Sequence, residues 1–276
     1  MNYAQAFKEI EIALTQVGED KENLTYVFKE LKSWTSLNLL MHLREEITTE
    51  DQLLLQEIKQ KLLDHQPPQY ITGKAYFRDL LLSVDARVLI PRPETEELVD
   101  LILKENPENR CSVLDIGTGS GAIALSLKKE RPSWCVQSSD ISLEALQLAK
   151  QNAKQNNLNI SFIHSDIFSS ISEKYDIIVS NPPYISYDDK AEVAKNVINH
   201  EPHLALFASN NGYSIYESIA KEASYYLNES GKLYFEIGYK QGETIKLLFE
   251  KYFPEKRVRI LRDQFGKDRM VIVNNG

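Results

Sequence analysis

The chain has 276 residues, 42% of them hydrophobic and 26% charged, which is typical of a globular protein with one medium domain and one small one. The formal net charge of −8 argues against binding of long nucleic acid mainly through phosphate contacts, because that mode needs clustered Lys and Arg. Cys111 and Cys135 are too few for a disulfide framework, which indicates a reducing compartment. Neither a secretion signal nor a run of about 18 apolar residues is present, so we expect a soluble, cytoplasmic protein.

Residues 1–66 carry helical patterns only. Apolar residues recur at three- and four-residue spacing within 3–17, 22–34, 37–47 and 51–65. Short polar breaks separate these stretches, and Thr49 or Asp51 is suited to cap the fourth helix. The pattern predicts a small helical-bundle domain over 1–66.

Residues 67–92 change character. Prolines open the segment, and two apolar, β-favouring stretches flank the sequence SVDAR at 83–87. This pattern predicts a β-hairpin that links the helical domain to the rest of the chain.

Over 93–276, strand and helix patterns alternate, which is typical of a parallel sheet covered by helices on both faces. The expected strands are 112–117, 135–141, 160–167, 175–181, 232–238, 257–263 and 270–275. The expected helices between them are 121–130, 143–157, a segment within 214–228, and 241–253. The last two strands leave room only for a hairpin turn, so the last strand is antiparallel. We predict an α/β fold with a Rossmann-like sheet.

A glycine-rich loop lies between the first expected strand and its helix. It consists of Gly117, Thr118, Gly119, Ser120 and Gly121. Glycines at such a turn let the backbone approach a ligand closely. The loop also satisfies a dinucleotide fingerprint, so by itself it does not decide the cofactor, and a tight turn without a ligand is the alternative.

Three acids stand at expected strand ends on the carboxyl side of the sheet: Asp115, Asp140 and Asp166. Asp140 lies where an acid that binds ribose belongs, and it can also favour the start of the next helix. An acidic crevice favours the cationic S-adenosyl-L-methionine over a dinucleotide, whose pyrophosphate favours helix N-terminal amides without a nearby acid. Asp166 is suited to accept a hydrogen bond from an adenine amino group, and Phe168 either covers the adenine ring or belongs to the core.

The fourth expected strand ends in Asn181, Pro182, Pro183 and Tyr184. The prolines fix their own φ and hold the preceding carbonyl groups in a rigid geometry. The Asn181 side-chain oxygen and a main-chain carbonyl can then accept both hydrogens of a substrate NH₂ group, while Tyr184 packs against a planar amide or base. This arrangement indicates methylation of an amide or aromatic amine; the alternative is a strand that simply ends in prolines.

Together with QPPQYITGKAYF at 66–77 and VLIPRPETEELV at 88–99, these motifs resemble the HemK/PrmC family of peptide chain release factor glutamine N5-methyltransferases over essentially the whole chain. The resemblance implies methyl transfer from S-adenosyl-L-methionine, which leaves S-adenosyl-L-homocysteine, to the glutamine of the Gly-Gly-Gln loop of class I release factors.

The resemblance also implies roles for particular residues. The loop 117–121, Asp140, Phe168 and Asn181 would hold the cofactor, and residues 181–184 would hold the glutamine and carry the catalysis. Arg92 and Thr95 would line or order the site, although Thr95 can instead cap the helix that follows. The helical domain would contact the release factor, and a monomer that binds no membrane and no nucleic acid is expected.

Some features leave alternatives open. The Asn-Pro-Pro-Tyr motif also occurs in adenine-N6 methyltransferases, and a third hypothesis is a non-catalytic adaptor that holds a translation factor. The segment Ser209–Gly212 stands where the family has a GGxDG sequence, which puts its close approach to the site in doubt. His200 and His203 flank a proline and have no evident third ligand, so we predict no metal site.

Overall fold

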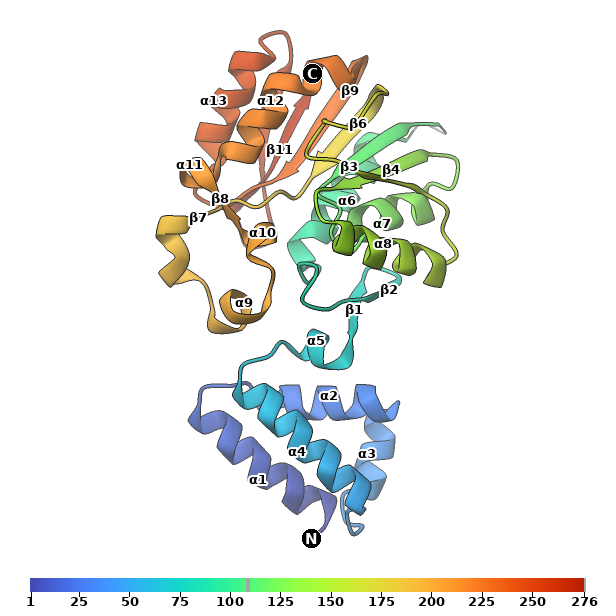
Figure 1. Ribbon diagram of the computed structural model, residues 1–276, viewed down its shortest axis with the longest axis vertical. Coiled ribbons are helices and arrows are strands. Elements are labelled where there is room, and N and C mark those ends of the chain that lie inside the picture. The colour runs from blue at the N-terminus through green and yellow to red at the C-terminus, as the bar shows by residue number, and fades with distance from the viewer. Residues whose placement is uncertain (108–109, 276) are drawn as a thin grey trace. The chain divides into compact units, whose positions relative to one another are not determined.

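The computed structural model describes residues 1–107 and 110–275, which form two compact units (Figure 1). The first unit consists of Met1–Lys74 and Ala194–His200, and the second of Ala75–Val193 and Glu201–Gly276. The hydrophobic pattern contains no signal that 194–200 joins the helical unit. Within that unit the His200 Nε2 atom lies 2.8 Å from the carbonyl oxygen of Asp64.

The first unit is helical, as the hydrophobic spacing predicts. Its helices are α1 (Tyr3–Gln16), α2 (Glu22–Lys32), α3 (Ser36–His42), α4 (Thr49–Leu63), α5 (Pro68–Thr72) and the later α9 (Lys195–His200). Side chains of α1, α2 and α4, among them Phe7 and Phe28, form its buried core. Thr48, rather than Thr49 or Asp51, caps α4, because the Thr48 side chain accepts a hydrogen bond from the Asp51 backbone N–H.

The predicted hairpin is present, but its turn lies earlier than expected. Strands β1 (Lys74–Phe77) and β2 (Leu80–Ser83) pair around a turn that begins at Arg78, whose φ is 51°. The Arg78 backbone N–H donates to the Glu96 carboxylate over 2.8 Å and thereby holds this turn. The placement of the turn at SVDAR is therefore wrong, since residues 84–92 follow the hairpin without forming a strand.

The second unit is built on a seven-stranded sheet in the order β10-β11-β9-β6-β3-β4-β5. Its strands are β3 (Ser112–Ile116), β4 (Cys135–Asp140), β5 (Ser161–His164), β6 (Tyr175–Ser180), β9 (Leu227–Glu236), β10 (Arg257–Arg262) and β11 (Asp268–Asn274). Neighbours from β5 to β9 pair in parallel, whereas β11 lies antiparallel between β9 and β10. The predicted α/β sheet with an antiparallel last strand is confirmed.

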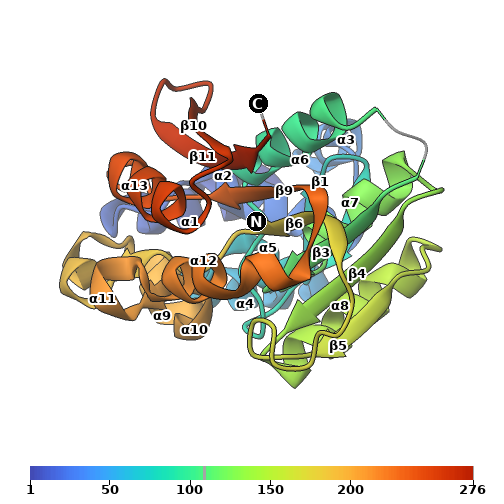
Figure 2. The same cartoon turned by 90° about the horizontal axis from the view of Figure 1, so that it is seen from above.

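Helices cover both faces of this sheet (Figure 2). They are α6 (Pro93–Glu105), α7 (Ala122–Glu130), α8 (Leu143–Gln155), α12 (Ser214–Tyr226) and α13 (Gly242–Tyr252). Successive strand residues point to opposite faces, so Val113 packs in the core shared with α6 and α7, and Leu114 in the core shared with α12 and α13. The central strands of the sheet are therefore buried on both faces.

Short elements follow the end of β6. They are β7 (Ile185–Ser186), the 3-10 helix η1 (Tyr187–Glu192), α10 (His203–Leu206), β8 (Phe207–Ala208) and α11 (Ser209–Gly212). Parallel pairing of β7 with β8 brings the segment 209–212 next to the chain that leaves β6. Across residues 1–107 and 110–275, no helix combines the length and apolar character that a membrane crossing requires.

Candidate active site

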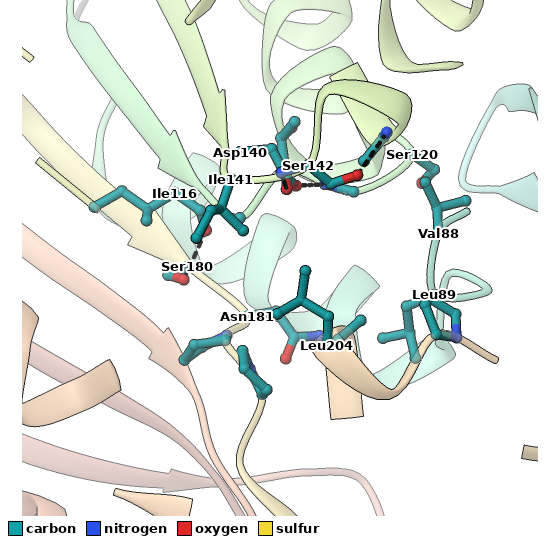
Figure 3. A pocket seen from close by; sticks show the side chains of 18 of the residues that line it. Val88, Leu89, Ile116, Ser120, Asp140, Ile141, Ser142, Ser180, Asn181 and Leu204 are labelled. Atoms are coloured by element: carbon teal, nitrogen blue, oxygen red, sulfur yellow. Dashed lines mark hydrogen bonds between the residues drawn. The ribbon is translucent and has the colours of Figure 1, made fainter. Parts of the chain in front are cut away.

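A cavity of about 360 Å³ lies at the carboxyl ends of strands β3, β4, β5 and β6 of the second unit. This volume falls within the range of about 300–1,000 Å³ that is typical of small-molecule sites. Figure 3 shows Asp140 and Ser142 on one side, Asn181 and Leu204 opposite them, and Val88 and Leu89 on a third side. Residues from distant parts of the chain therefore meet at one edge of the sheet.

The glycine-rich loop forms part of the cavity wall. Gly117, Thr118, Gly119 and Ser120 line the cavity, whereas Gly121 lies behind them as the N-cap of α7. Gly119 has φ 56° and Gly121 has φ 86°, in the left-handed region that side chains disfavour. A Cβ atom on Gly121 would also lie 3.0 Å from the Leu125 side chain, so glycine allows α7 to begin against the loop.

Asp140 is tied to the loop by hydrogen bonds. Its Oδ2 accepts from the Gly119 backbone N–H over 2.9 Å, and its Oδ1 accepts from the Ser142 N–H over the same distance. Burial raises the pKa of Asp140, while these backbone donors act in the opposite direction. The carboxylate is held at the cavity wall, where its remaining lone pairs can accept hydrogen bonds from ligand hydroxyl groups.

Asp115 lies beneath the loop and does not line the cavity. Its Oδ2 accepts a hydrogen bond of 2.7 Å from the Thr118 hydroxyl. Burial of the side chain, which is 1% exposed, raises the pKa of Asp115 to about 7. The residue thus orders the loop, and the structure does not bring it to the position of a direct ligand contact.

Of the two site residues predicted after β5, Asp166 and Phe168, only Asp166 lies at the cavity. Asp166 is exposed and lines the cavity. Phe168 does not: its ring is 1% exposed and stacks on Tyr226 with centroids 4.4 Å apart. Ile167, with φ 50°, lines the cavity in its place. Of the two alternatives for Phe168, the structure therefore favours the core residue over the residue that covers a cofactor ring. The chain turns sharply at Ile167 and directs the aromatic ring into the core.

The Asn-Pro-Pro-Tyr segment supplies the opposite wall. Asn181, Pro182 and Pro183 line the cavity, whereas Tyr184 lies outside its lining and is close to Gly238. Burial raises the pKa of Tyr184 to about 12, so its phenol stays neutral. Three of the four predicted residues therefore face the same space as the glycine-rich loop.

The carbonyl group of Tyr184 anchors this segment from behind. The Gln241 side chain donates to it over 3.0 Å, and Gly212 packs so closely that a Cβ atom there would lie 2.1 Å from the carbonyl oxygen. Asn210 and Asn211, like Gly212, have positive φ. The segment 209–212 therefore approaches the Tyr184 carbonyl group closely, although none of its residues lines the cavity.

Hydrogen bonds join the half-buried Asn181 to two buried residues, Thr95 and Glu236. The Asn181 Nδ2 donates to Thr95 Oγ1 over 3.2 Å, and Thr95 Oγ1 donates to Glu236 Oε2 over 2.6 Å. Thr95 does not cap α6, whose N-cap is Arg92. The sequence analysis does not identify Glu236 as a site residue. A single carboxylate within the buried strand segment KLYFEIG is nevertheless a signal of a functional role, because acids are rarely buried without a partner.

Arg92 lines the cavity and is paired with a second buried acid. Its guanidinium donates to Glu201 Oε1, and Glu201 Oε2 accepts from the Ile90 backbone N–H over 3.2 Å. Glu201, which is 3% exposed, thereby fixes the segment 90–92 at the cavity. Sequence reasoning treats Glu201 only as part of a loop between two histidines.

The strand order, the glycine-rich loop and the cavity at the carboxyl edge define the fold of class I methyltransferases. The sequence matches the family described as methyltransferase small domain over residues 95–208 and the PrmC N-terminal domain over residues 5–73. A methyltransferase from Pyrococcus furiosus has a similar fold, with a TM-score of 0.55 at 21% identity over 72% of this chain and 90% of that one.

Sequence relatives define the family more narrowly. A release factor glutamine methyltransferase of Streptococcus pneumoniae is 56% identical over 277 residues, which covers 100% of this chain and 99% of the relative. One of Lactococcus lactis is 52% identical over 92% of this chain and 94% of the relative. The chain belongs to the family of release factor glutamine methyltransferases.

Proposed function

We propose that this protein transfers a methyl group from S-adenosyl-L-methionine to the side-chain amide nitrogen, N5, of the glutamine in the Gly-Gly-Gln motif of class I peptide chain release factors. S-adenosyl-L-homocysteine is the second product, and the modification supports translation termination. The observation that carries the proposal is the Asn181 amide at the cavity wall, whose nitrogen is engaged by Thr95 and whose oxygen is left for a substrate. The family membership points to the same substrate.

The residues present fit the proposed methyl donor. The loop Gly117–Ser120 offers a wall without bulky side chains, Asp140 offers acceptors for ribose hydroxyl groups, and Asp166 an acceptor for an amino group. Ile141 and Ile167 supply apolar surface for a planar ring. When bound, S-adenosyl-L-methionine supplies an electrophilic methyl group beside these residues.

The residues of this chain make the glutamine amide nitrogen, a poor nucleophile, able to react. An amide nitrogen reacts slowly because its lone pair is delocalised into the carbonyl group. The Asn181 oxygen and a main-chain carbonyl of the rigid Pro182–Pro183 segment accept hydrogen bonds from the two amide N–H groups and orient the nitrogen toward the methyl donor. The same acceptors stabilise the positive charge that grows on nitrogen, which then loses a proton as the N-methyl amide forms.

The remaining expectations belong to the same proposal. The helical first unit, which matches the PrmC N-terminal domain, would contact the release factor. A net charge of −8 disfavours nucleic acid as the substrate. We expect a monomer that meets its substrate in the cytoplasm, where translation terminates.

An Asn181→Ala variant tests the acceptor role. We expect methyl transfer to a purified release factor to fall by about 100-fold or more, because the amide hydrogens lose an oriented acceptor. Binding of S-adenosyl-L-methionine, measured by calorimetry, should persist. Asn159→Ala, at an exposed asparagine outside the cavity lining, serves as the matched control and should retain full activity. Wild-type activity of Asn181→Ala would contradict the proposal.

A further inference from the structure

Glu236 is a buried carboxylate at the end of β9, 2% exposed, that lies behind the cavity and does not line it. Its Oε2 accepts a hydrogen bond from Thr95 Oγ1, and that oxygen in turn accepts one from Asn181 Nδ2. The carboxylate therefore lies at the buried end of this group, and the Asn181 amide lies at the cavity end. The Asn181 side chain also interacts directly with the carboxylate, and this contact, like the Thr95 hydrogen bond, lowers the pKa of Glu236.

The chemistry of the two ends fixes the direction of these hydrogen bonds. An ionised carboxylate has no proton to donate, so the Thr95 hydroxyl must donate to Glu236 and can only accept from Asn181. An amide carries its donors on nitrogen and its acceptor on oxygen, so the nitrogen of Asn181 faces Thr95. The reversed amide would set its oxygen against a hydroxyl that has no proton left to give.

We propose that Glu236 is a positioning residue for methyl transfer: through Thr95 it holds the Asn181 amide with its oxygen toward the cavity, where that oxygen accepts a substrate N–H. The inference rests on the proposed function, in which Asn181 receives an amide hydrogen of a glutamine. Glu236 does not line the cavity and acts through Thr95 and through its own contact with Asn181, so its effect should appear in kcat and not in cofactor binding.

The surroundings of Glu236 make the orientation of the Asn181 amide sensitive to pH. Burial raises the pKa of Glu236 to about 7, and Arg269, which also pairs with Asp263, acts in the opposite direction. The titratable and charged groups that face Glu236 come from four segments: Glu94 of α6, Tyr184 after β6, Tyr216 of α12 and Arg269 of β11. A protonated Glu236 can donate to Thr95, which frees the hydroxyl to donate to Asn181 and removes the preference for one amide orientation.

Three variants of the full-length protein test the inference. Thr95→Val removes the hydroxyl at nearly constant shape, and Thr95→Ser restores it. We expect Thr95→Val to lower kcat by about 10- to 100-fold, because small misplacements of reacting groups cost that much. Thr95→Ser should retain most of the activity, and calorimetry should find the affinity for S-adenosyl-L-methionine unchanged in both. The kcat of the wild type should fall as the pH is lowered through about 7, and this decline should be absent from Glu236→Gln.

The positioning role is overturned if Thr95→Val and Glu236→Gln keep the wild-type kcat and the wild-type pH profile. Asn181→Ala separates that result from a failure of the proposed function. An active Asn181→Ala would contradict the acceptor role itself, whereas an inactive Asn181→Ala beside a fully active Thr95→Val would refute the positioning role alone. The Thr95 pair decides the question even where Glu236→Gln does not fold.

Discussion

The backbone N–H of Gly119 donates a hydrogen bond of 2.9 Å to the carboxylate of Asp140, which joins the glycine-rich loop to the end of the neighbouring strand. The second carboxylate oxygen accepts from the Ser142 N–H at the start of α8. Loop, acid and helix are thus one hydrogen-bonded structure. A change in Asp140 should therefore disturb the loop as well as remove an acceptor for the ligand.

Asp140→Asn should weaken the binding of S-adenosyl-L-methionine by about 1–3 kcal/mol, or roughly 5- to 150-fold in Kd. The asparagine amide sets an N–H donor against one of two backbone N–H donors, Gly119 or Ser142, so one of these contacts is lost. Calorimetric titration measures the change. Asp189→Asn, at an exposed acid outside the cavity lining, is the matched control, and an equal Kd in both variants would contradict the assignment.

Gly212→Ala should lower both stability and activity. The new methyl group would clash with the Tyr184 carbonyl oxygen at 2.1 Å, and φ at Gly212 is 85°. We expect a loss of about 3 kcal/mol or more of unfolding free energy. Gly266→Ala separates the two causes, because Gly266 has φ 75° with no atom within 4 Å of the added carbon. It should cost only about 1 kcal/mol; equal losses in urea denaturation would show that the contact with Tyr184 has no special role.

Phe168→Leu should reduce stability and leave cofactor affinity unchanged. The ring stacks on Tyr226 in the core and does not line the cavity, so its truncation costs about 1–3 kcal/mol of packing. Ile167→Ala, at the neighbouring cavity residue, should show the reverse, a weaker affinity with a smaller loss of stability. Thermal unfolding and calorimetry measure the two quantities. A large rise in Kd for Phe168→Leu at constant stability would contradict this assignment and indicate that the aromatic ring contacts the cofactor.

The sequence predicts the sheet, its antiparallel last strand and the cavity-lining role of Asn181, because each depends on local patterns and on where strands end. It does not predict the partners of Thr95, since Glu236 is 141 residues away in the chain and only tertiary packing unites them. The position of Phe168 escapes prediction for another reason. Ile167 has a positive φ, which β-branched residues rarely adopt, so the sequence contains no sign of the turn there.

The stability of the protein should depend on pH through Asp115. Burial raises the pKa of this carboxyl from 3.8 to about 7, so the folded state binds a proton more tightly than the unfolded chain does. The stability that this group contributes is therefore present at low pH and is lost as the pH rises from about 4 to about 7, with an upper limit of about 4 kcal/mol. Unfolding by urea at about pH 5 and about pH 8 measures this loss.

The Asp115→Asn variant isolates this contribution from the other titrating groups. Because asparagine cannot ionise, the variant should gain unfolding free energy relative to the wild type as the pH rises across the same range. The control Asp189→Asn should follow the wild-type pH dependence, since its side chain is exposed. Parallel curves for Asp115→Asn and the wild type would contradict the account of the buried carboxyl.

The central claim is that the Asn181 amide and the prolines after it present an amide nitrogen to a methyl donor. Mass spectrometry of a class I release factor, incubated with this protein and S-adenosyl-L-methionine, tests the claim most directly. We predict one added methyl group, located by fragmentation on the glutamine of the Gly-Gly-Gln motif, and a rate of addition lower by about 100-fold or more with Asn181→Ala. An unmodified release factor would contradict the account. A methyl group found instead on adenine in a parallel incubation with nucleic acid would identify a different substrate. No transfer in either incubation would favour a non-catalytic adaptor.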